Sequence, residues 1–306
     1  MGRISVIIPL YNDADNIVRC LESVCAQTIS GLLDILIVDD GSTDNSVSTA
    51  RNVLESHSML QQASIISLEQ NQGVANARKV GVQAAQSDFI LFCDSDDWME
   101  PTMCEKLLAK AENEMCDLVI CDYNSIRGNS IEPVSGCYKE NFLQQLILCT
   151  VTGALWNKLI KTDILHRPDF LFPVHDFSED YAYSLQFAIY ARNIGYVPEA
   201  LYNYVHRSGS VVQSASAERQ KKRYDDDMQN FRLDLEILEN NGLLEKYREE
   251  IIAHKLKMKN TYDNNWKLWK TTFPELTNDI FSSHFISFRS RIAYIIRYLG
   301  LLKKEV

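Results

Sequence analysis

The first 123 residues alternate between short apolar runs and stretches in which apolar residues recur at helical spacing. The apolar runs predict buried strands over 5–10, 33–39, 64–68, 89–93 and 118–123. The helical stretches predict helices over 14–27, 42–58, 74–85 and 101–114. Strands that alternate with helices through short joints are typical of an α/β domain built on a mostly parallel sheet.

The run at 89–93 leads directly into three acidic residues, Asp94, Asp96 and Asp97, with Ser95 among them. A strand buried on both faces fixes the position of this cluster, and its carboxylates repel one another unless a cation offsets their charge. The alternative interpretation is a solvated turn that caps the helix beginning near Pro101. Spacing alone leaves both interpretations open.

Polar residues also follow the other predicted strands, at 11–13, 39–44 and 69–73. In α/β sheets, ligands bind beyond the carboxyl ends of the strands, where the strand order reverses. Turns rich in Asn, Asp, Ser and Gly explain any single one of these clusters. Because the clusters follow one another at one edge of the sheet, we favour a ligand site there.

Four blocks of this region, at 5–12, 37–44, 71–81 and 94–97, are similar in order and spacing to the family 2 glycosyltransferases with a GT-A fold. Further blocks at 155–160, 178–181 and 201–207 resemble those of bacterial members that build capsular and O-antigen polysaccharides. The resemblance covers roughly residues 4 to 212. It has one departure, because Lys79 stands after Arg78 where the family usually has Asn.

The resemblance implies a fold and a division of the chain. Residues 1–212 would form the GT-A nucleotide-sugar-binding and catalytic domain, a Rossmann-like and mostly parallel sheet flanked by helices. Residues 213–306, whose pattern is helical with a break at 240–242, would form a C-terminal helical extension. Between 122 and 154 the pattern weakens into short runs, which we interpret as a loop-rich border that faces the acceptor.

The resemblance also assigns roles to residues. The nucleotide-sugar would be bound at the ends of the first four strands, by Pro9, Tyr11, Asn12, Asp39, Asn71, Gly73, Arg78, Asp94, Ser95 and Asp96. Asp94 and Asp96 would form the DXD pair that holds Mg²⁺ or Mn²⁺, ions that prefer hard oxygen ligands. Asp180 would be the catalytic base, and the acceptor side would include Trp156, Lys158 and Glu179.

These roles predict an inverting, metal-dependent glycosyltransferase, specifically a hexosyltransferase. The sugar would pass from a nucleoside diphosphate sugar, a UDP-sugar, to a hydroxyl of a glycan or lipid-linked oligosaccharide in surface polysaccharide synthesis. A metal-bound diphosphate leaves without an acid, so one carboxylate base suffices, whereas glycosidases use two. The alternative role for Glu179 and Asp180 is structural, since acids in the first turn of a helix interact favourably with its dipole.

Two other classes of function stay open. A nucleotidyltransferase uses a similar sheet, but it typically needs an N-terminal loop rich in Gly and in Arg or Lys, which 9–13 lacks. A catalytically silent nucleotide-sugar-binding module would keep the nucleotide blocks and lose the base. The presence of Glu179 and Asp180 speaks against this second class.

Composition narrows the partners and the compartment. The formal net charge of −10 argues against a nucleic-acid binder, because phosphate contacts need a surplus of Lys and Arg. The 8 cysteines include no C-x-x-C pair, and no apolar stretch has the length of a transmembrane helix. The N-terminus lacks the pattern of a secretory signal, so we expect a cytoplasmic protein.

The segment 285–304 combines aromatic and aliphatic residues with Arg and Lys. On an acidic chain this pattern resembles an amphipathic helix at a negatively charged surface, here the cytoplasmic face of the inner membrane. The alternative is a helix that docks its apolar stripe on the domain or on a second subunit, as in a homodimer. The sequence leaves both interpretations open.

Overall fold

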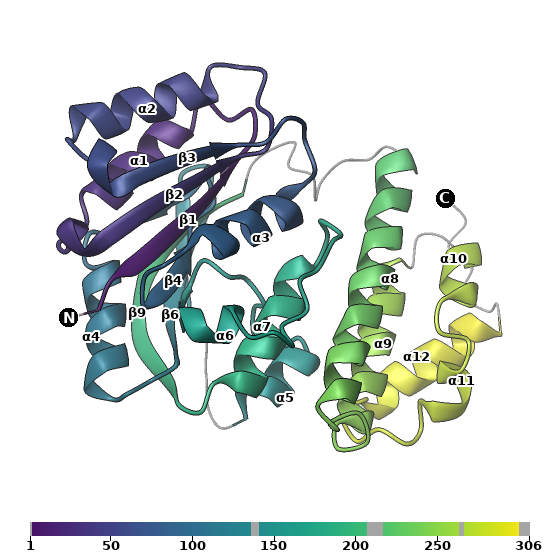
Figure 1. Cartoon of the computed structure of the whole chain (residues 1–306). Helices are drawn as coiled ribbons and strands as arrows, with labels where there is room; N and C mark the ends of the chain where they lie inside the picture. The colour runs from purple at the N-terminus through teal and green to yellow at the C-terminus, as the bar shows by residue number, and fades with distance from the viewer. Residues whose placement is uncertain (1, 136–140, 207–216, 263–265, 300–306) are drawn as a thin grey trace. The chain divides into compact units, whose positions relative to one another are not determined.

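The computed structural model describes residues 2–135, 141–206, 217–262 and 266–299 (Figure 1). The chain forms two compact units, which we describe separately. The first contains Met1–Tyr138 and Gly153–Ile237, and the second contains Lys139–Thr152 and Leu238–Val306. This division concerns packing, so the predicted functional boundary after residue 212 stays a prediction.

The first unit is an α/β structure. Its strands are β1 (Ile4–Leu10), β2 (Leu33–Asp39), β3 (Ala63–Ser67), β4 (Phe89–Phe92), β5 (Trp98–Met99), β6 (Leu118–Arg127), β7 (Ser130–Val134), β8 (Lys158–Lys161) and β9 (Ile194–Val205). Its helices are α1 (Ile17–Cys25), α2 (Ser46–Ser56), α3 (Val74–Ala84), α4 (Met103–Asn113), α6 (Thr162–Leu165) and α7 (Glu179–Tyr190). The helix α8 (Ala217–Asn240) begins in this unit and ends in the second. The strands and helices expected over residues 5–123 are therefore confirmed, with shifted ends.

The strands form one mixed sheet in the order β3-β2-β1-β4-β8-β6-β9-β5, with β7 paired to β6. The strands from β3 to β4 are parallel, whereas β8 runs antiparallel to both of its neighbours. Since the chain moves from β1 to β2 and β3 and then returns to β4 on the other side of β1, the strand order reverses between β1 and β4. This switch point is where an open α/β sheet binds its ligand.

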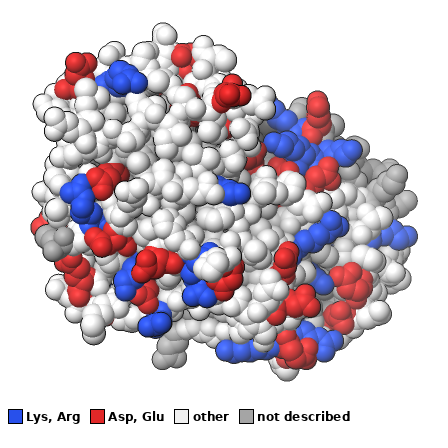
Figure 2. Space-filling view, in the orientation of Figure 1, with Lys and Arg blue, Asp and Glu red and all other residues white. Residues whose placement is uncertain are grey.

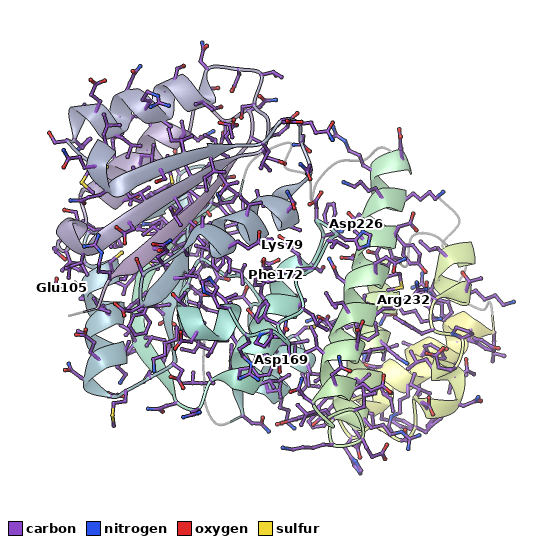
Figure 3. All side chains as sticks on the ribbon, viewed as in Figure 1. Lys79, Glu105, Asp169, Phe172, Asp226 and Arg232 are labelled. Carbon is purple, nitrogen blue, oxygen red and sulfur yellow. The ribbon has the colours of Figure 1, made fainter. Side chains whose placement is uncertain are left out.

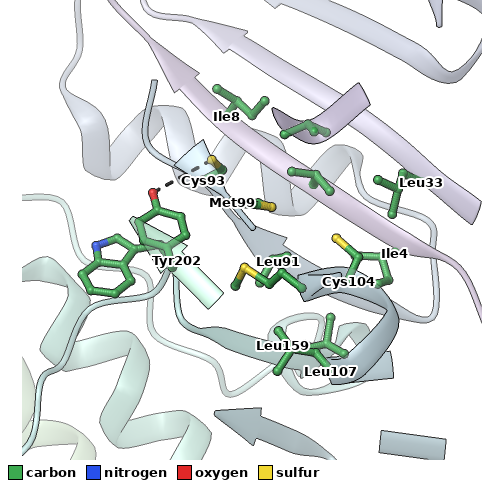
Figure 4. Close-up of a cluster of buried hydrophobic side chains, with 14 of the residues drawn as sticks. Ile4, Ile8, Leu33, Leu91, Cys93, Met99, Cys104, Leu107, Leu159 and Tyr202 are labelled. Atoms are coloured by element: carbon green, nitrogen blue, oxygen red, sulfur yellow. Dashed lines mark hydrogen bonds between the residues drawn. The ribbon is translucent and has the colours of Figure 1, made fainter. Parts of the chain in front are cut away.

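Helices cover both faces of this sheet, which explains why its central strands β1 and β4 are buried throughout (Figure 1). All residues of β1 and β4 are buried, as the sequence predicts for the run at 89–93. One face of β1 packs with α1 in the main core, part of which Figure 4 shows around Ile8, Leu91 and Cys104. The helix α3 packs on β1 and β2, where a Cβ added at Gly81 would lie 2.4 Å from Ile7 Cγ2.

The region between 122 and 154 is more ordered than expected. Strand β6 continues to Arg127 and forms a hairpin with β7, and Gly128 in the turn has a left-handed φ of +58°. The helix α5 (Phe142–Ile147) follows and belongs to the second unit. The expectation of a loop-rich border was wrong here, because the alternation in the hairpin is too weak to be recognised from sequence. The part at 136–140 lies outside the described residues.

The second unit is helical. Besides α5 it contains α9 (Arg248–Thr261), α10 (Trp266–Thr271), α11 (Leu276–Asp279) and α12 (Phe288–Tyr298). The predicted break is confirmed, since α8 ends at Asn240 and Gly242 has a φ of +68°. Its core is formed by Ile252, Leu256, Trp269, Leu276, Ile280, Ile286 and Tyr294. Within the described ranges, none of the helices combines the length and the hydropathy that crossing a membrane requires.

Candidate active site

The sequence-predicted site residues gather at the switch point of the sheet. The end of β1 leads to Tyr11, whose side chain is 46% exposed, and the neighbouring strand β4 leads through Cys93 to Asp94. Pro9 is buried within β1, where it pairs with Val38 of β2. An exposed aromatic ring beside partly exposed carboxylates is a suitable surface for a nucleotide.

Asn12 ties the end of β1 to the loop that follows β2. Its backbone has a left-handed φ of +46°, and its side-chain Oδ1 accepts a hydrogen bond of 2.8 Å from the Thr43 N–H. In return, the Asn12 N–H donates to Ser42 Oγ at 3.0 Å, and Ser42 N–H donates to Asp39 Oδ1 at 2.9 Å. The structure therefore uses Asn12 and Asp39 to shape the two loops around the site.

The glycine turn before α3 is held by a carboxylate that sequence analysis did not single out. Asp40 accepts hydrogen bonds of 2.8 Å from the N–H groups of Gln72 and Gly73, and its burial raises the pKa of this carboxyl. Gly73 has a φ of +94°, and an added Cβ would lie 2.1 Å from Asp176 Oδ1. Only glycine fits this position. Asn71, two residues earlier in the same turn, is exposed. In the sequence, the position of Asp40 directly after Asp39 could have identified it as a site residue.

Arg78 joins the two acidic motifs of the site. The guanidinium donates from Nη2 to Asp94 Oδ1 at 2.9 Å and from Nη1 to Glu179 Oε1. Both Arg78 and Glu179 are 5% exposed. Burial acts to lower the pKa of Arg78, but the charges of Asp94, Glu179 and Asp180 outweigh it and raise this pKa. Burial and the charge of Asp180 raise the pKa of Glu179, against the effect of Arg78.

The acidic cluster after β4 divides into residues with different roles. Asp97 is fully buried and accepts hydrogen bonds from the Tyr202 hydroxyl at 3.0 Å and the Val205 N–H at 2.8 Å. Burial and the charge of Asp94 raise the pKa of Asp97 well above its usual range. The Tyr202 hydroxyl also accepts from the Asp94 N–H at 3.1 Å, and a dashed line in Figure 4 joins it to Cys93 Sγ. Asp97 is therefore a buried structural residue that links the turn after β4 to β9. Asp94 and Asp96 remain partly exposed.

The residues between these carboxylates are fixed by the loop after β1 and by α1. Ser95 Oγ donates to Asp13 Oδ2 at 2.7 Å, and the Asp96 carbonyl accepts from Arg19 Nη2 at 2.6 Å. Among the residues that the structure describes, no three His, Cys, Asp or Glu side chains form a metal-binding group. Mg²⁺ at nucleotide sites typically takes one or two carboxylates together with phosphate oxygens of the substrate. Asp96 and Asp94 fit a divalent cation of this kind.

The block at 155–160 around Trp156 is buried. Its indole ring stacks on Tyr202, with centroids 4.6 Å apart and planes at 7°, and on Tyr204 at 5.4 Å. Trp156 is 6% exposed and Lys158 is fully buried, so neither offers its side chain to the surface. The predicted acceptor-side role of these residues stays a prediction, and their burial favours an indirect one.

Asp180 lies in the first turn of α7, as predicted, and its side chain is half-buried. Its charge acts on Arg78, Glu179 and Lys158. The Lys158 amine donates to Asn157 Oδ1 at 3.0 Å and to the Ala154 carbonyl at 2.5 Å, and burial lowers its pKa to about 7. The candidate base thus belongs to the same charged network as the DXD pair.

Lys79 lies outside this network. Its amine is 5.8 Å from the centroid of the Phe172 ring, and Figure 3 labels both residues. Where the family usually has Asn, this chain therefore has a cation that faces an aromatic ring. On the face drawn in Figure 2, the described Lys and Arg side chains are interspersed with Asp and Glu.

A mixed α/β sheet with a carboxylate pair at the switch point and a glycine turn beside it is a fold of the GT-A type. The model of the family described as Glycosyl transferase family 2 matches residues 5–151. The chain is 32% identical over 259 residues to EpsH of Bacillus subtilis, named as a glycosyltransferase, with 81% of this chain and 72% of EpsH covered. This chain belongs to glycosyl transferase family 2, and it is a glycosyltransferase.

Other relatives and solved structures agree with this family. Glycosyltransferase GlyG of Streptococcus pneumoniae is 29% identical, with 69% of this chain and 73% of GlyG covered. The structure of Staphylococcus aureus TarS with UDP-GlcNAc has a TM-score of 0.60 at 19% identity and covers 87% and 82% of the two chains. Mannosyltransferase PcManGT from Pyrobaculum calidifontis, solved with GDP-Man and Mn²⁺, has a TM-score of 0.60 at 16% identity and covers 99% and 81%. At these identities, the solved structures establish the fold alone.

Proposed function

We propose that this glycosyltransferase is inverting and metal-dependent. It moves a sugar from a UDP-sugar to a hydroxyl of a glycan or lipid-linked oligosaccharide in surface polysaccharide synthesis. The observation that carries the proposal is the bridge from Arg78 to Asp94 and Glu179, because it holds the predicted donor edge beside Asp180. The UDP-GlcNAc bound to TarS and the GDP-Man and Mn²⁺ bound to PcManGT support a nucleotide-sugar donor and a divalent cation.

The donor half of the site is the edge formed by β1, β2 and β4. The exposed ring of Tyr11 is available to stack on a base, and Asp39 ends β2 opposite Leu10, the residue before Tyr11. Asp96, with Asp94 alongside, would hold the cation, which neutralises the charge that grows on the departing diphosphate. Arg78 holds Asp94 in place for this role.

Asp180 is the proposed base. It takes the proton from the acceptor hydroxyl while the hydroxyl oxygen bonds to the anomeric carbon. The electron pair of the broken carbon–oxygen bond leaves with the diphosphate on the opposite side, which gives inversion. Glu179 is less suited to this task, because its buried carboxylate is paired with Arg78. The charge of Asp180 acts in turn on Lys158, which lies nearby without facing the solvent.

We also propose that α12 binds a negatively charged membrane surface. Tyr294 faces the core of the second unit, whereas a second apolar stripe stays exposed, formed by Phe285, Phe288, Ile292, Ile295 and Leu299. Phe288, Ile292, Ile295 and Leu299 recur every three or four positions, so they share one helix face, and Phe285 lies just before the helix. The only charged residues of α12 are arginines, at 289, 291 and 297. Arg289 is exposed, whereas the Arg297 guanidinium lies 5.1 Å from the ring centroid of the buried Trp269, so Arg289 is the positive charge that this face offers to anionic lipid.

The metal role is tested by titrating UDP into the protein with and without Mn²⁺ in a calorimeter. We expect Mn²⁺ to increase the affinity of the wild type at least tenfold and to have no effect on Asp96→Ala. The matched control is Asp163→Ala, which removes an exposed carboxylate in α6 and should keep the full response to Mn²⁺. An Asp96→Ala protein with the wild-type response would contradict the proposed metal site.

A further inference from the structure

One face of α8 contacts the short segment that immediately precedes Glu179 and Asp180. The contacts join Lys222 to Asp176, Arg223 to Phe177, Asp226 to His175, Asp227 to Ser178, and Asn230 to the carbonyls of His175 and Phe177. These positions of α8 lie on adjoining turns of one face, and Figure 3 labels Asp226 among them. We call residues 175–178 the pre-base segment.

Asn230 makes the most buried of these contacts. Its side chain is 1% exposed, and Nδ2 donates to the His175 carbonyl at 2.9 Å and to the Phe177 carbonyl at 2.5 Å. Its Oδ1 is buried without a hydrogen-bond partner among the described residues, which is unfavourable. The amide therefore acts through its two donated bonds, and both go to the backbone of the pre-base segment.

Ser178 shows how α8 replaces an ordinary helix cap. This residue is the N-cap of α7, has a left-handed φ of +62° and makes no side-chain capping bond. Its hydroxyl instead donates to Asp227 Oδ1 at 2.6 Å. A serine at the N-cap usually accepts a hydrogen bond from a backbone N–H of its own helix. Here the Ser178 side chain is bonded to α8 instead, so α8 helps to fix the start of α7.

The same segment also touches the glycine turn of the donor site. Asp176 Oδ1 accepts from the Ala75 N–H at 3.4 Å and lies against Gly73. Its other oxygen lies 3.3 Å from the Lys222 amine of α8. The pre-base segment is therefore held between α8 on one side and the donor turn on the other.

We propose that Asn230 is a positioning residue for the reaction, which fixes the pre-base segment and thereby the carboxylate of Asp180. This inference rests on the proposed function, because it assumes that Asp180 is the base. Asn230 lies beyond residues 5–151, which the family model matches, and outside the blocks that resemble the family. Its role follows from the contacts of α8 alone.

The test compares Asn230→Ala with Gln229→Ala, a control that changes an exposed neighbour on α8. The assay measures UDP or GDP release with Mn²⁺ from whichever UDP- or GDP-sugar of a panel the wild type turns over fastest. Displacement of a catalytic group by about 1 Å can cost about 10²-fold in rate. We expect Asn230→Ala to lower kcat by about 10- to 100-fold with unchanged nucleotide affinity, and Gln229→Ala to match the wild type.

The second readout is a double-mutant cycle with Asp180→Asn. If Asn230 acts by placing the base, Asn230→Ala should cause no further loss of kcat once the base is absent. An equal loss in both backgrounds, or an unchanged kcat, would overturn the inference. Ser178→Ala provides an independent test, because this exposed residue can be changed without disturbing the core, and it should lower kcat about tenfold.

The cycle also separates this inference from the function on which it rests. If Asp180→Asn is fully active, the proposed base is wrong. If Asp180→Asn is inactive while Asn230→Ala and Ser178→Ala both keep the wild-type kcat, the base stands and the positioning role is refuted.

Discussion

Replacing Arg78 with Met should destabilise the protein strongly, because it leaves a buried acid without its counter-charge. Glu179 is 5% exposed and has the charge of Asp180 beside it. Removing one partner of a buried ion pair typically costs about 3–5 kcal/mol. Asp94, the other partner of Arg78, is 25% exposed on its side chain, so water can replace the lost bond there. We therefore expect Arg78→Met to lower the free energy of unfolding by about 3–5 kcal/mol at pH 7, mostly through Glu179.

The loss should depend on pH with a defined sign. Burial and Asp180 raise the pKa of Glu179 above its unfolded value even beside Arg78, and the loss of Arg78 raises this pKa further, so the folded variant keeps a proton that the unfolded chain releases. Stability of the variant therefore falls as pH rises through the folded pKa and recovers toward pH 5. Urea unfolding of wild type and Arg78→Met at several pH values measures this difference.

Two further proteins make the test specific. The double variant Arg78→Met/Glu179→Gln removes the unpaired acid, and it should recover most of the stability that Arg78→Met loses. Arg3→Met is the matched control, because Arg3 makes bonds of 2.5 and 3.1 Å to Asp34 in an exposed pair and should cost at most about 1 kcal/mol. If Arg78→Met costs no more than Arg3→Met, or if Glu179→Gln does not rescue it, the buried bridge is not what stabilises the site.

Two other predictions concern Lys158 and α12. Burial lowers the pKa of Lys158 to about 7, so the unfolded chain binds more protons than the folded one above this pH. Urea unfolding should show the wild type gaining up to roughly 2 kcal/mol over Lys158→Met between pH 7 and 9, and a constant difference would refute the depressed pKa. Co-sedimentation with phosphatidylglycerol vesicles should be lost on raising salt or in Phe288→Ser/Ile292→Ser, whereas the exposed control Glu245→Gln should bind normally. Equal binding by the double variant would remove the proposed membrane face.

The sequence predicts the parallel half of the sheet well because its signals are local. Strands β1 and β4 are each buried between two layers of helices. A strand in this position needs apolar residues on both faces, so it can be recognised as an apolar run in the sequence. The strand β8 was not recognised, because it is short and begins with the buried Lys158. Its position depends on antiparallel pairing with β4, where Leu159 lies opposite Leu91.

The sequence identified several residues of the site but not the contacts between them. The motifs indicate Arg78, Asp94 and Glu179 separately, but Arg78 and Glu179 are 101 positions apart and meet only in the folded chain. The distinct role of Asp97 depends on Tyr202, which is 105 positions away. The sequence also predicted the start of the second helix too early, at residue 42. The helix α2 begins at Ser46, and Ser42 accepts from Asn12 instead.

For the amphipathic segment at 285–304, the sequence did not show which of its apolar residues are buried. Its sequence was compatible with docking or with a membrane face. In the structure, α12 docks through Tyr294 and keeps a second apolar stripe exposed around Phe288 and Ile292. Residues 300–304 of the predicted segment lie outside the described residues, so the contribution of Lys303 and Lys304 stays a prediction.

The central claim, that Asp180 is the base of the transfer reaction, is tested most directly by Asp180→Asn. Turnover of the nucleotide-sugar, nucleotide affinity and melting temperature should be measured on the same protein. We predict that kcat falls by about 10²–10⁴-fold while affinity and melting temperature stay at wild-type values, since Asn keeps the shape and loses the proton acceptor. If Asp180 only stabilises the first turn of α7, a fully active Asp180→Asn enzyme would result and would contradict the account.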